Sequence, residues 1–123
     1  MDRAEATQFA QAWIDAWNAR DLERIVSLFS DDAVFTSPKA AAVTGIGTQQ
    51  GKGAIRKYWE TALQRINSLR FELLETHLDP DASTLWVVYL SELNGSRHRS
   101  CEVFKFDPSG KVREGEAFYG APA

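Results

Sequence analysis

Residues 84–119 read TLWVVYLSELNGSRHRSCEVFKFDPSGKVREGEAFY. This stretch holds three runs rich in β-branched and aromatic residues, over 84–93, 97–107 and 111–119, and Asn-Gly-Ser and Asp-Pro-Ser-Gly lie between them. Such segments are typical of tight turns between antiparallel strands. A fourth run of the same kind, 69–78, precedes the stretch, so the second half of the chain predicts a four-stranded meander.

The first half of the chain predicts three helices. Over about residues 3–18, apolar side chains recur at three- and four-residue steps, as in an amphipathic helix: Phe9, Trp13, Ala16 and Trp17. Asp21 can cap a short second helix, whose apolar residues share one face: Leu22, Ile25, Val26 and Phe29. A third helix follows Gly53, with its apolar stripe at Ile55, Trp59, Ala62, Leu63 and Ile66.

Between the second and third helices the pattern changes. Residues 33–37 alternate as a short strand, which Pro38 closes because proline cannot donate a hydrogen bond to a neighbouring strand. Residues 39–53 contain four glycines and no regular period, so we interpret them as a loop. Helices grouped before strands favour one α+β domain over residues 1–123, with three N-terminal helices packed on a curved antiparallel sheet.

The composition narrows the possible functions. With 44% hydrophobic residues, 25% charged residues and a net charge of -3, the chain is typical of globular proteins rather than of disordered or nucleic-acid-binding ones. No stretch approaches the roughly 18 apolar residues of a membrane span. A lone Cys101, and a beginning without the apolar run of a signal peptide, predict a cytoplasmic location.

The sequence carries no cofactor or metal motif. The glycines within 45–53 match neither a dinucleotide-binding nor a phosphate-binding spacing. His77 and His98 lie on different predicted strands, with no further histidine or cysteine at metal-ligand spacing. Asp31 and Asp32 end the second helix, where turn formation is their simplest role. We therefore expect no metal and no cofactor.

Four segments resemble the nuclear transport factor 2-like superfamily, in particular its ketosteroid isomerase and SnoaL-like branches. They are WIDAWNARDL at 13–22, IVSLFSDDA at 25–33, GAIRKY at 53–58 and FKFDPSGKV at 104–112. The resemblance implies a cone-shaped fold around an apolar pocket, and a homodimer. It is specific for the fold rather than the function, because the superfamily hosts isomerases, cyclases, dehydratases, epoxide hydrolases and non-catalytic modules.

The resemblance to the steroid isomerase site is partial. In that mechanism an aspartate moves the proton, while a tyrosine and a neutral carboxylic acid donate hydrogen bonds to the oxyanion. The position that matches the base is Ser37, which cannot take the proton without a neighbouring histidine. Trp13 matches the tyrosine and can donate but not titrate. Only the position of the neutral carboxylic acid holds a residue with the same functional group, Glu102.

Strand pairing gives a second view of Glu102. A hairpin loop over 107–110 pairs Phe106 with Lys111, and counting back places Phe104 opposite Arg113, Glu102 opposite Gly115 and His98 opposite Tyr119. Side chains alternate along a strand, so these residues share one face, and its aromatic content favours it as the concave side. Gly115 then leaves open space beside the carboxyl group or marks a β-bulge.

Several residues keep two interpretations. Glu102 contacts a ligand or forms an ion pair with Arg113. His98 and Tyr119 are rim contacts or a proton-transfer pair. The aromatic residues of the helices and the first strand are core or pocket wall. Trp86 packs on the outer face of the sheet or contacts a second copy of the chain.

These observations predict a pocket for a hydrophobic small molecule, with Glu102 at its polar centre. We expect it to be lined by Trp13, Trp17, Phe35, Ser37, Trp59, Tyr89, His98, Phe104, Arg113, Gly115 and Tyr119. The function is a cofactor-independent isomerase, cyclase or dehydratase for a hydrophobic carbonyl compound, with Glu102 as acid or base, or a non-catalytic binding or dimerisation module. We expect a homodimer through Trp86, Val103 and Phe118, and no nucleic-acid or membrane partner.

Overall fold

Six strands form one sheet in the computed structural model, which describes residues 1–123. The helices are α1 (Arg3–Asn18), α2 (Leu22–Ser27), α3 (Pro38–Thr44) and α4 (Lys52–Arg65). The strands are β1 (Phe29–Thr36), β2 (Thr48–Gln50), β3 (Leu69–Asp79), β4 (Thr84–Leu93), β5 (Ser96–Phe106) and β6 (Val112–Pro122). The predicted class, helices packed on a curved sheet in an α+β fold, is confirmed.

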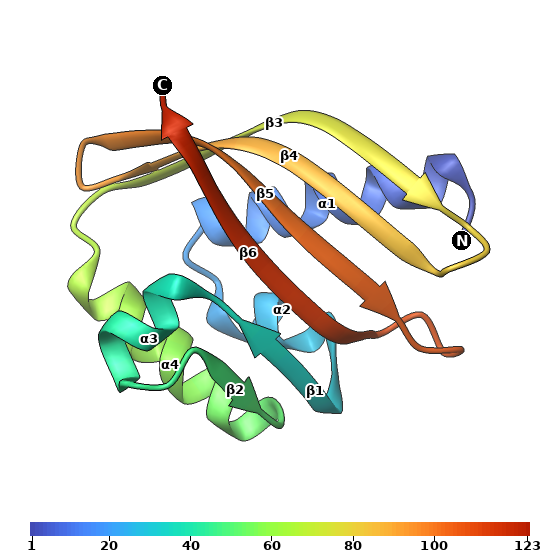
Figure 1. The fold of residues 1–123 in the computed structure, drawn as a ribbon, viewed down its shortest axis with the longest axis horizontal. Coiled ribbons are helices and arrows are strands. Elements are labelled where there is room, and N and C mark those ends of the chain that lie inside the picture. The colour runs from blue at the N-terminus through green and yellow to red at the C-terminus, as the bar shows by residue number, and fades with distance from the viewer.

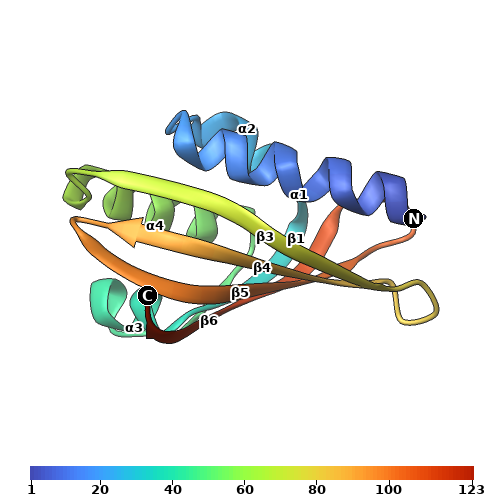
Figure 2. The ribbon, with the colours of Figure 1, turned by 90° about the horizontal axis from the view of Figure 1, so that it is seen from above.

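The strands follow the order β2-β1-β6-β5-β4-β3 (Figure 1). Strands β3 to β6 are the predicted antiparallel meander. The sheet as a whole is mixed, because β1 comes from the helical half of the chain and runs parallel to β6, with Phe35 paired to Gly115. Figure 2 shows α1 and α2 on one side of this sheet. None of the helices has the length and apolar character needed to cross a membrane.

Helix α1 covers the concave face of the sheet. It begins with a capping box, in which the Asp2 carboxylate accepts from the Glu5 N–H at 2.8 Å and the Glu5 carboxylate accepts from the Asp2 N–H at 3.1 Å. At its other end, the Asn18 amide donates to the Phe71 carbonyl and accepts from the Phe71 N–H. These bonds fix α1 against β3 and hold Trp13 and Trp17 over the sheet.

The predicted loop at 39–53 was wrong in part, because it contains α3 and β2. The Ser37 hydroxyl caps α3 by accepting from the Lys39 N–H at 3.2 Å, Pro38 lies in its first turn, and Gly45 ends it with a φ of 84°. Strand β2 then pairs with β1. A helix of seven residues and a strand of three are too short to show a period in the sequence.

The predicted register between β5 and β6 was also wrong. Phe106 pairs with Val112, Phe104 with Gly115, Glu102 with Ala117 and Ser100 with Tyr119. Residues 107–111 form the turn, one more than in the predicted hairpin loop, and the Asp107 carboxylate accepts from the N–H groups of Ser109 and Lys111. The strand pairing shifts between Lys105 and Phe106, where β5 enters this turn. Val112 therefore enters the core, and Arg113 faces solvent.

Candidate functional site

A cavity of about 300 Å³ lies between the helices and the concave face of the sheet. Fourteen of its 18 lining residues are hydrophobic. The aromatic ones come from both helices and strands: Trp13, Trp17, Phe35, Tyr58, Trp59, Phe71, Tyr89 and Tyr119. The charged ones are Glu102, Lys39 and Arg65. The cavity is thus an apolar chamber with a few polar groups, which is the usual character of a small-molecule site.

The aromatic rings hold one another in place. Trp17 meets Trp59 with ring centroids 5.6 Å apart, and Phe35 meets Trp59 at 5.2 Å, both edge-on. Trp13 meets the Tyr89 ring at 5.1 Å in the same manner. Edge-to-face pairs add stabilisation to the burial itself and restrict the rings to few orientations. The wall therefore has a defined shape formed by α1, α4, β1 and β4.

Glu102 is the polar centre of the cavity. It lies on β5 between Val87 of β4 and Ala117 of β6, and only 4% of it is exposed. The Tyr89 hydroxyl donates to its Oε1 at 3.4 Å, and Glu102 takes part in none of the seven ion pairs of the chain. Burial raises the pKa of Glu102 to about 8, against the smaller opposing effect of the Tyr89 hydrogen bond. The carboxyl group is therefore mostly neutral at pH 7.

Three tyrosine hydroxyls share the chamber with Glu102. Burial raises the pKa of Tyr58 to about 12, and it raises the pKa of Tyr89 and of Tyr119 well above the ordinary value. The nearby Glu102 charge acts in the same direction on all three. The nearby Ser37 hydroxyl opposes part of the shift in the pKa of Tyr58 and of Tyr119. All three phenols therefore keep their protons and can donate hydrogen bonds.

The wall also contains an unpaired donor. The Trp17 ring lines the cavity, and its Nε1–H is the only buried side-chain nitrogen or oxygen of the chain without a hydrogen-bond partner. A buried donor without an acceptor lowers the stability of the fold by about 1–3 kcal/mol.

No three histidine, cysteine, aspartate or glutamate side chains come together as a possible metal site.

Seven of the residues predicted for the site line this cavity: Trp13, Trp17, Phe35, Trp59, Tyr89, Glu102 and Tyr119. Ser37 is buried as the cap of α3, and Phe104 is buried beneath the Phe9 and Trp13 rings. The predicted open space at Gly115 is absent. A Cβ atom there would lie 3.2 Å from the Phe35 ring and 3.3 Å from the Phe29 ring.

Two predicted contacts do not form. Arg113 is exposed and its guanidinium lies 3.3 Å from the Glu114 carboxylate, so it does not pair with Glu102. His98 pairs with Pro122 near the end of β5, whereas Tyr119 pairs with Ser100, and His98 does not line the cavity. Irregular pairing between β5 and β6 separates both pairs of residues.

Several lining residues were not among those predicted from the sequence. Tyr58 lies beside Trp59 on α4, three residues after the buried Ile55, so the helical stripe could have included it. Phe71 alternates with Leu69 and Leu73 along β3 and could have been found by the same argument. Lys39, Arg65 and Asn94 lie at element ends, where no period identifies them.

Comparisons with known proteins agree with this architecture. A model of the SnoaL-like domain matches residues 10–115. No curated protein matches the chain. A SnoaL-like protein of unknown function from Burkholderia thailandensis E264 is 34% identical, with a TM-score of 0.87 over 98% of each chain.

Two solved structures of lower identity share the fold. One is SalBIII, described as an epoxide hydrolase/cyclase-like enzyme in pyran ring formation in the polyether salinomycin. It is 20% identical, with a TM-score of 0.76 over 97% of this chain and 93% of its own. The other is TerC, co-crystallised with polyporic acid, which is 17% identical, with a TM-score of 0.77 over 93% of this chain and 90% of its own.

Proposed function

The chain belongs to the SnoaL-like family, and from this premise we propose that its cavity binds a hydrophobic carbonyl or epoxide compound on which Glu102 acts as acid and base. The reaction class is a cofactor-independent isomerisation, cyclisation or dehydration. The observation that carries the proposal is a buried carboxyl group without a cation, inside an aromatic chamber.

The environment of Glu102 suits proton transfer. A general acid is most effective when its pKa lies near the working pH, and burial brings the pKa of Glu102 to about 8. The chamber has few polar groups, so a hydrogen bond from the neutral carboxyl group to a substrate oxygen is stronger there than in water. Tyr58 and Tyr119 supply further donors around the same space.

A single carboxyl group can both supply the proton that such a reaction needs and take back the proton that it releases. Neutral Glu102 gives its proton to the oxygen of a carbonyl or epoxide, and the carboxylate that results accepts a proton from the substrate. In an epoxide-opening cyclisation, the C–O bond of the epoxide breaks as a hydroxyl of the same substrate forms the new C–O bond and loses its proton to Glu102. The residue ends the cycle in the state in which it began.

Two proteins of the same fold support this direction. SalBIII is described as an epoxide hydrolase/cyclase-like enzyme, and TerC was co-crystallised with polyporic acid. The alternative function is a non-catalytic binding module. Two observations favour it. Ser37 serves as the cap of α3, and no histidine or second carboxylate lines the cavity with Glu102.

The two functions are separated by a proton-exchange experiment with 4-acetylbiphenyl, a hydrophobic ketone with acidic methyl hydrogens. In D2O near pH 8, we expect the protein to accelerate exchange of these hydrogens, measured by proton NMR. Glu102→Gln should lower that rate by about 100-fold or more. The variant Glu72→Gln, at an exposed glutamate of β3 that lines neither the cavity nor the outer-face hollow, is the matched control and should keep the wild-type rate. Binding of the ketone without exchange would establish the non-catalytic alternative.

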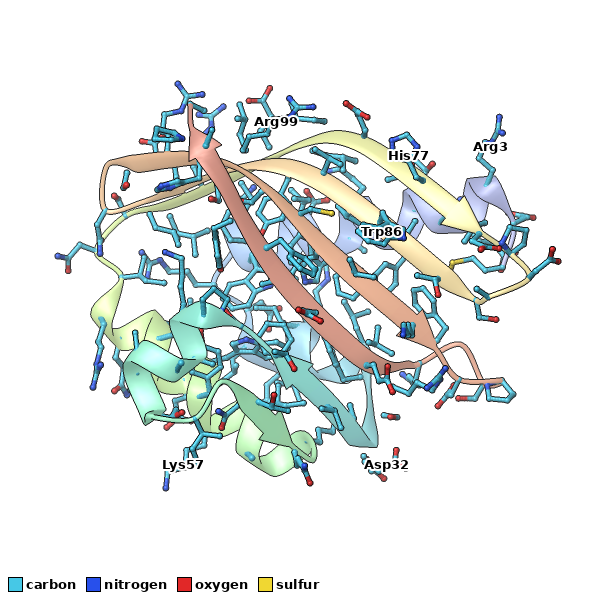
Figure 3. All side chains as sticks on the ribbon, viewed as in Figure 1. Arg3, Asp32, Lys57, His77, Trp86 and Arg99 are labelled. Atoms are coloured by element: carbon cyan, nitrogen blue, oxygen red, sulfur yellow. The ribbon has the colours of Figure 1, made fainter.

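We also propose that the chain forms a homodimer through the outer face of the sheet. Trp86 and Phe118 are each 46% exposed there, and Val103 pairs with Trp86 in the next strand. With Val34 they form the apolar part of a shallow hollow on this face, where Figure 3 shows Trp86, and Lys105, Glu114 and Glu116 line the rest of it. Exposed apolar patches of this kind mark protein contacts. Light scattering should report a dimer for the wild type and a monomer for Trp86→Glu, whereas a wild-type monomer at micromolar concentration would contradict the proposal.

A further inference from the structure

The mouth of the cavity carries positive charge. Lys39 lies at the start of α3, Arg65 at the end of α4 and Asn94 in the turn between β4 and β5, and all three line the cavity. Arg65 and Asn94 are exposed and Lys39 is half-buried, so these residues mark the opening rather than the interior. The left side of Figure 1 shows the three elements that carry these residues, α3, the end of α4 and the β4–β5 turn.

The two cations have no acidic partner. Neither Lys39 nor Arg65 takes part in any of the seven ion pairs of the chain. The Lys39 Nζ lies 4.5 Å from the centre of the Tyr119 ring, a contact that fixes the ammonium group at the cavity edge without neutralising it. Both cations are therefore free to pair with a bound anion.

Asn94 adds a neutral donor to the same opening. Its Oδ1 accepts from the N–H groups of Asn67 and Ser68, at 2.7 and 3.2 Å, which fixes the orientation of the side chain. Its amide nitrogen makes no hydrogen bond within the chain. The mouth thus presents an ammonium group, a guanidinium group and an amide N–H, which are the donors that carboxylates prefer.

The charge of the cavity opposes the charge of the whole chain. The chain has a net charge of -3, yet the only acidic residue that lines the cavity is Glu102, which is mostly neutral at pH 7. The cavity therefore carries two positive charges from Lys39 and Arg65. Cations at the rim of an apolar cleft attract anions and hold them at the opening, where the charge can stay partly hydrated.

From this arrangement we infer that the ligand is an amphipathic acid. Its carboxylate lies at the mouth between Lys39 and Arg65, its hydrophobic body lies against the aromatic wall, and its carbonyl or epoxide oxygen reaches Glu102. The position of the body and the reacting oxygen rests on the proposed function. The position of the carboxylate rests on the mouth residues alone.

The inference is tested with two probes that differ in charge. One is an acetylbiphenyl that carries a carboxylate at the far para position, and the other is the same compound as a carboxamide. By isothermal titration calorimetry at pH 7 and low salt, we expect the wild type to bind the carboxylate about tenfold more tightly. The double variant Lys39→Gln/Arg65→Gln should bind the two probes equally, with little change in affinity for the carboxamide.

A matched control removes the same charge elsewhere. Lys57 and Arg70 are exposed, form no ion pair and do not line the cavity, and Figure 3 shows Lys57 at the surface. The variant Lys57→Gln/Arg70→Gln should keep the tenfold preference. Equal binding of both probes by the wild type, or a preference that survives in Lys39→Gln/Arg65→Gln, overturns the inference and leaves the cavity proposal standing. Failure of both probes to bind overturns the inference and the proposed function together.

Discussion

The two faces of the sheet place glutamate side chains in opposite environments. On the inner face, Glu102 is buried, has no cation beside it and has a pKa of about 8. On the outer face, Glu75 is exposed, accepts from His77 at 2.9 Å and pairs with Arg99 at 2.9 Å. The hydrogen bond with His77, and then the Arg99 charge, hold the pKa of Glu75 below its ordinary value.

This difference identifies the face on which chemistry can occur. A carboxylate that is paired with cations in water stays ionised and contributes little to catalysis or stability. A carboxyl group that burial keeps neutral has lost hydration, and that cost persists only where the surrounding fold holds it in place. Glu102 on the inner face is therefore the carboxyl group suited to chemistry. Matched substitutions on the two faces should have different effects.

The largest contrast concerns packing. Phe104 is fully buried on the inner face, and Phe118 is 46% exposed on the outer face. Phe104→Ala should lower the free energy of unfolding by about 4 kcal/mol, because it leaves a cavity beneath α1. Phe118→Ala should lower it by less than about 1 kcal/mol when both variants are made in the monomeric Trp86→Glu background, where no dimer contact is lost. Urea unfolding at one protein concentration measures both, and equal losses would contradict the assignment of the faces.

The next contrast concerns pH. Because the pKa of Glu102 is raised by folding from 4.5 to about 8, its contribution to stability is complete below pH 4.5 and is lost as the pH rises toward 8. From pH 5 to pH 7 the wild type should lose about 2.5 kcal/mol through this group, because each pH unit in this window changes the free energy of unfolding by at most about 1.36 kcal/mol. Glu102→Gln should lose none of it. Parallel stability curves for the two proteins would show that Glu102 is ionised in the fold.

A smaller effect is expected for the hydroxyl that contacts Glu102. The Tyr89 hydrogen bond lowers the pKa of Glu102, so Tyr89→Phe should raise that pKa further. The same variant should lower the free energy of unfolding by about 1 kcal/mol, the usual effect of one lost hydrogen bond. A carbon-13 NMR titration measures the pKa, and a downward shift would show that Tyr89 does not donate to the carboxylate.

The smallest effect is expected on the outer face, and its sign is opposite. The lowered pKa of Glu75 means that this carboxylate stabilises the fold above pH 4.5 and that the stabilisation is lost as the pH falls. Glu75→Gln should therefore lower the stability above pH 5 by a small amount that does not vary with pH, and should reduce the further loss of stability in acid. Chemical unfolding between pH 3 and pH 6 measures the difference.

Long regular elements could be predicted from the sequence. The amphipathic stripe predicted a helix over 3–18, which is α1, and the run at 84–93 has the bounds of β4. The sequence also predicted that Glu102 points to the concave face of the sheet, although the residue predicted opposite it on β6 was wrong. From Ser100 to Lys105 the predicted register differs from the observed one by two residues, and a shift of two keeps the paired side chains on the same face.

The remaining site features depend on local irregularities and on packing. The irregularity that follows the β5–β6 turn moves Arg113 to the surface and Val112 into the core, and no residue type in the sequence marks it. Lys39 reaches the cavity because α3 folds back beside α4, which no periodic pattern reports. The position of Glu102 could therefore be predicted, and the cationic mouth could not.

The proposal depends on a Glu102 carboxyl group that burial keeps neutral, and a titration of this group tests it most directly. Carbon-13 labelling of glutamate side chains allows the Glu102 carboxyl resonance to be followed through a pH titration, with Glu102→Gln used to assign it. We expect a titration midpoint near pH 8, because burial raises the pKa of this carboxyl group. A midpoint near 4.5, the ordinary value for glutamate, would show an ionised carboxylate in the cavity and would contradict the assignment of Glu102 as a neutral acid.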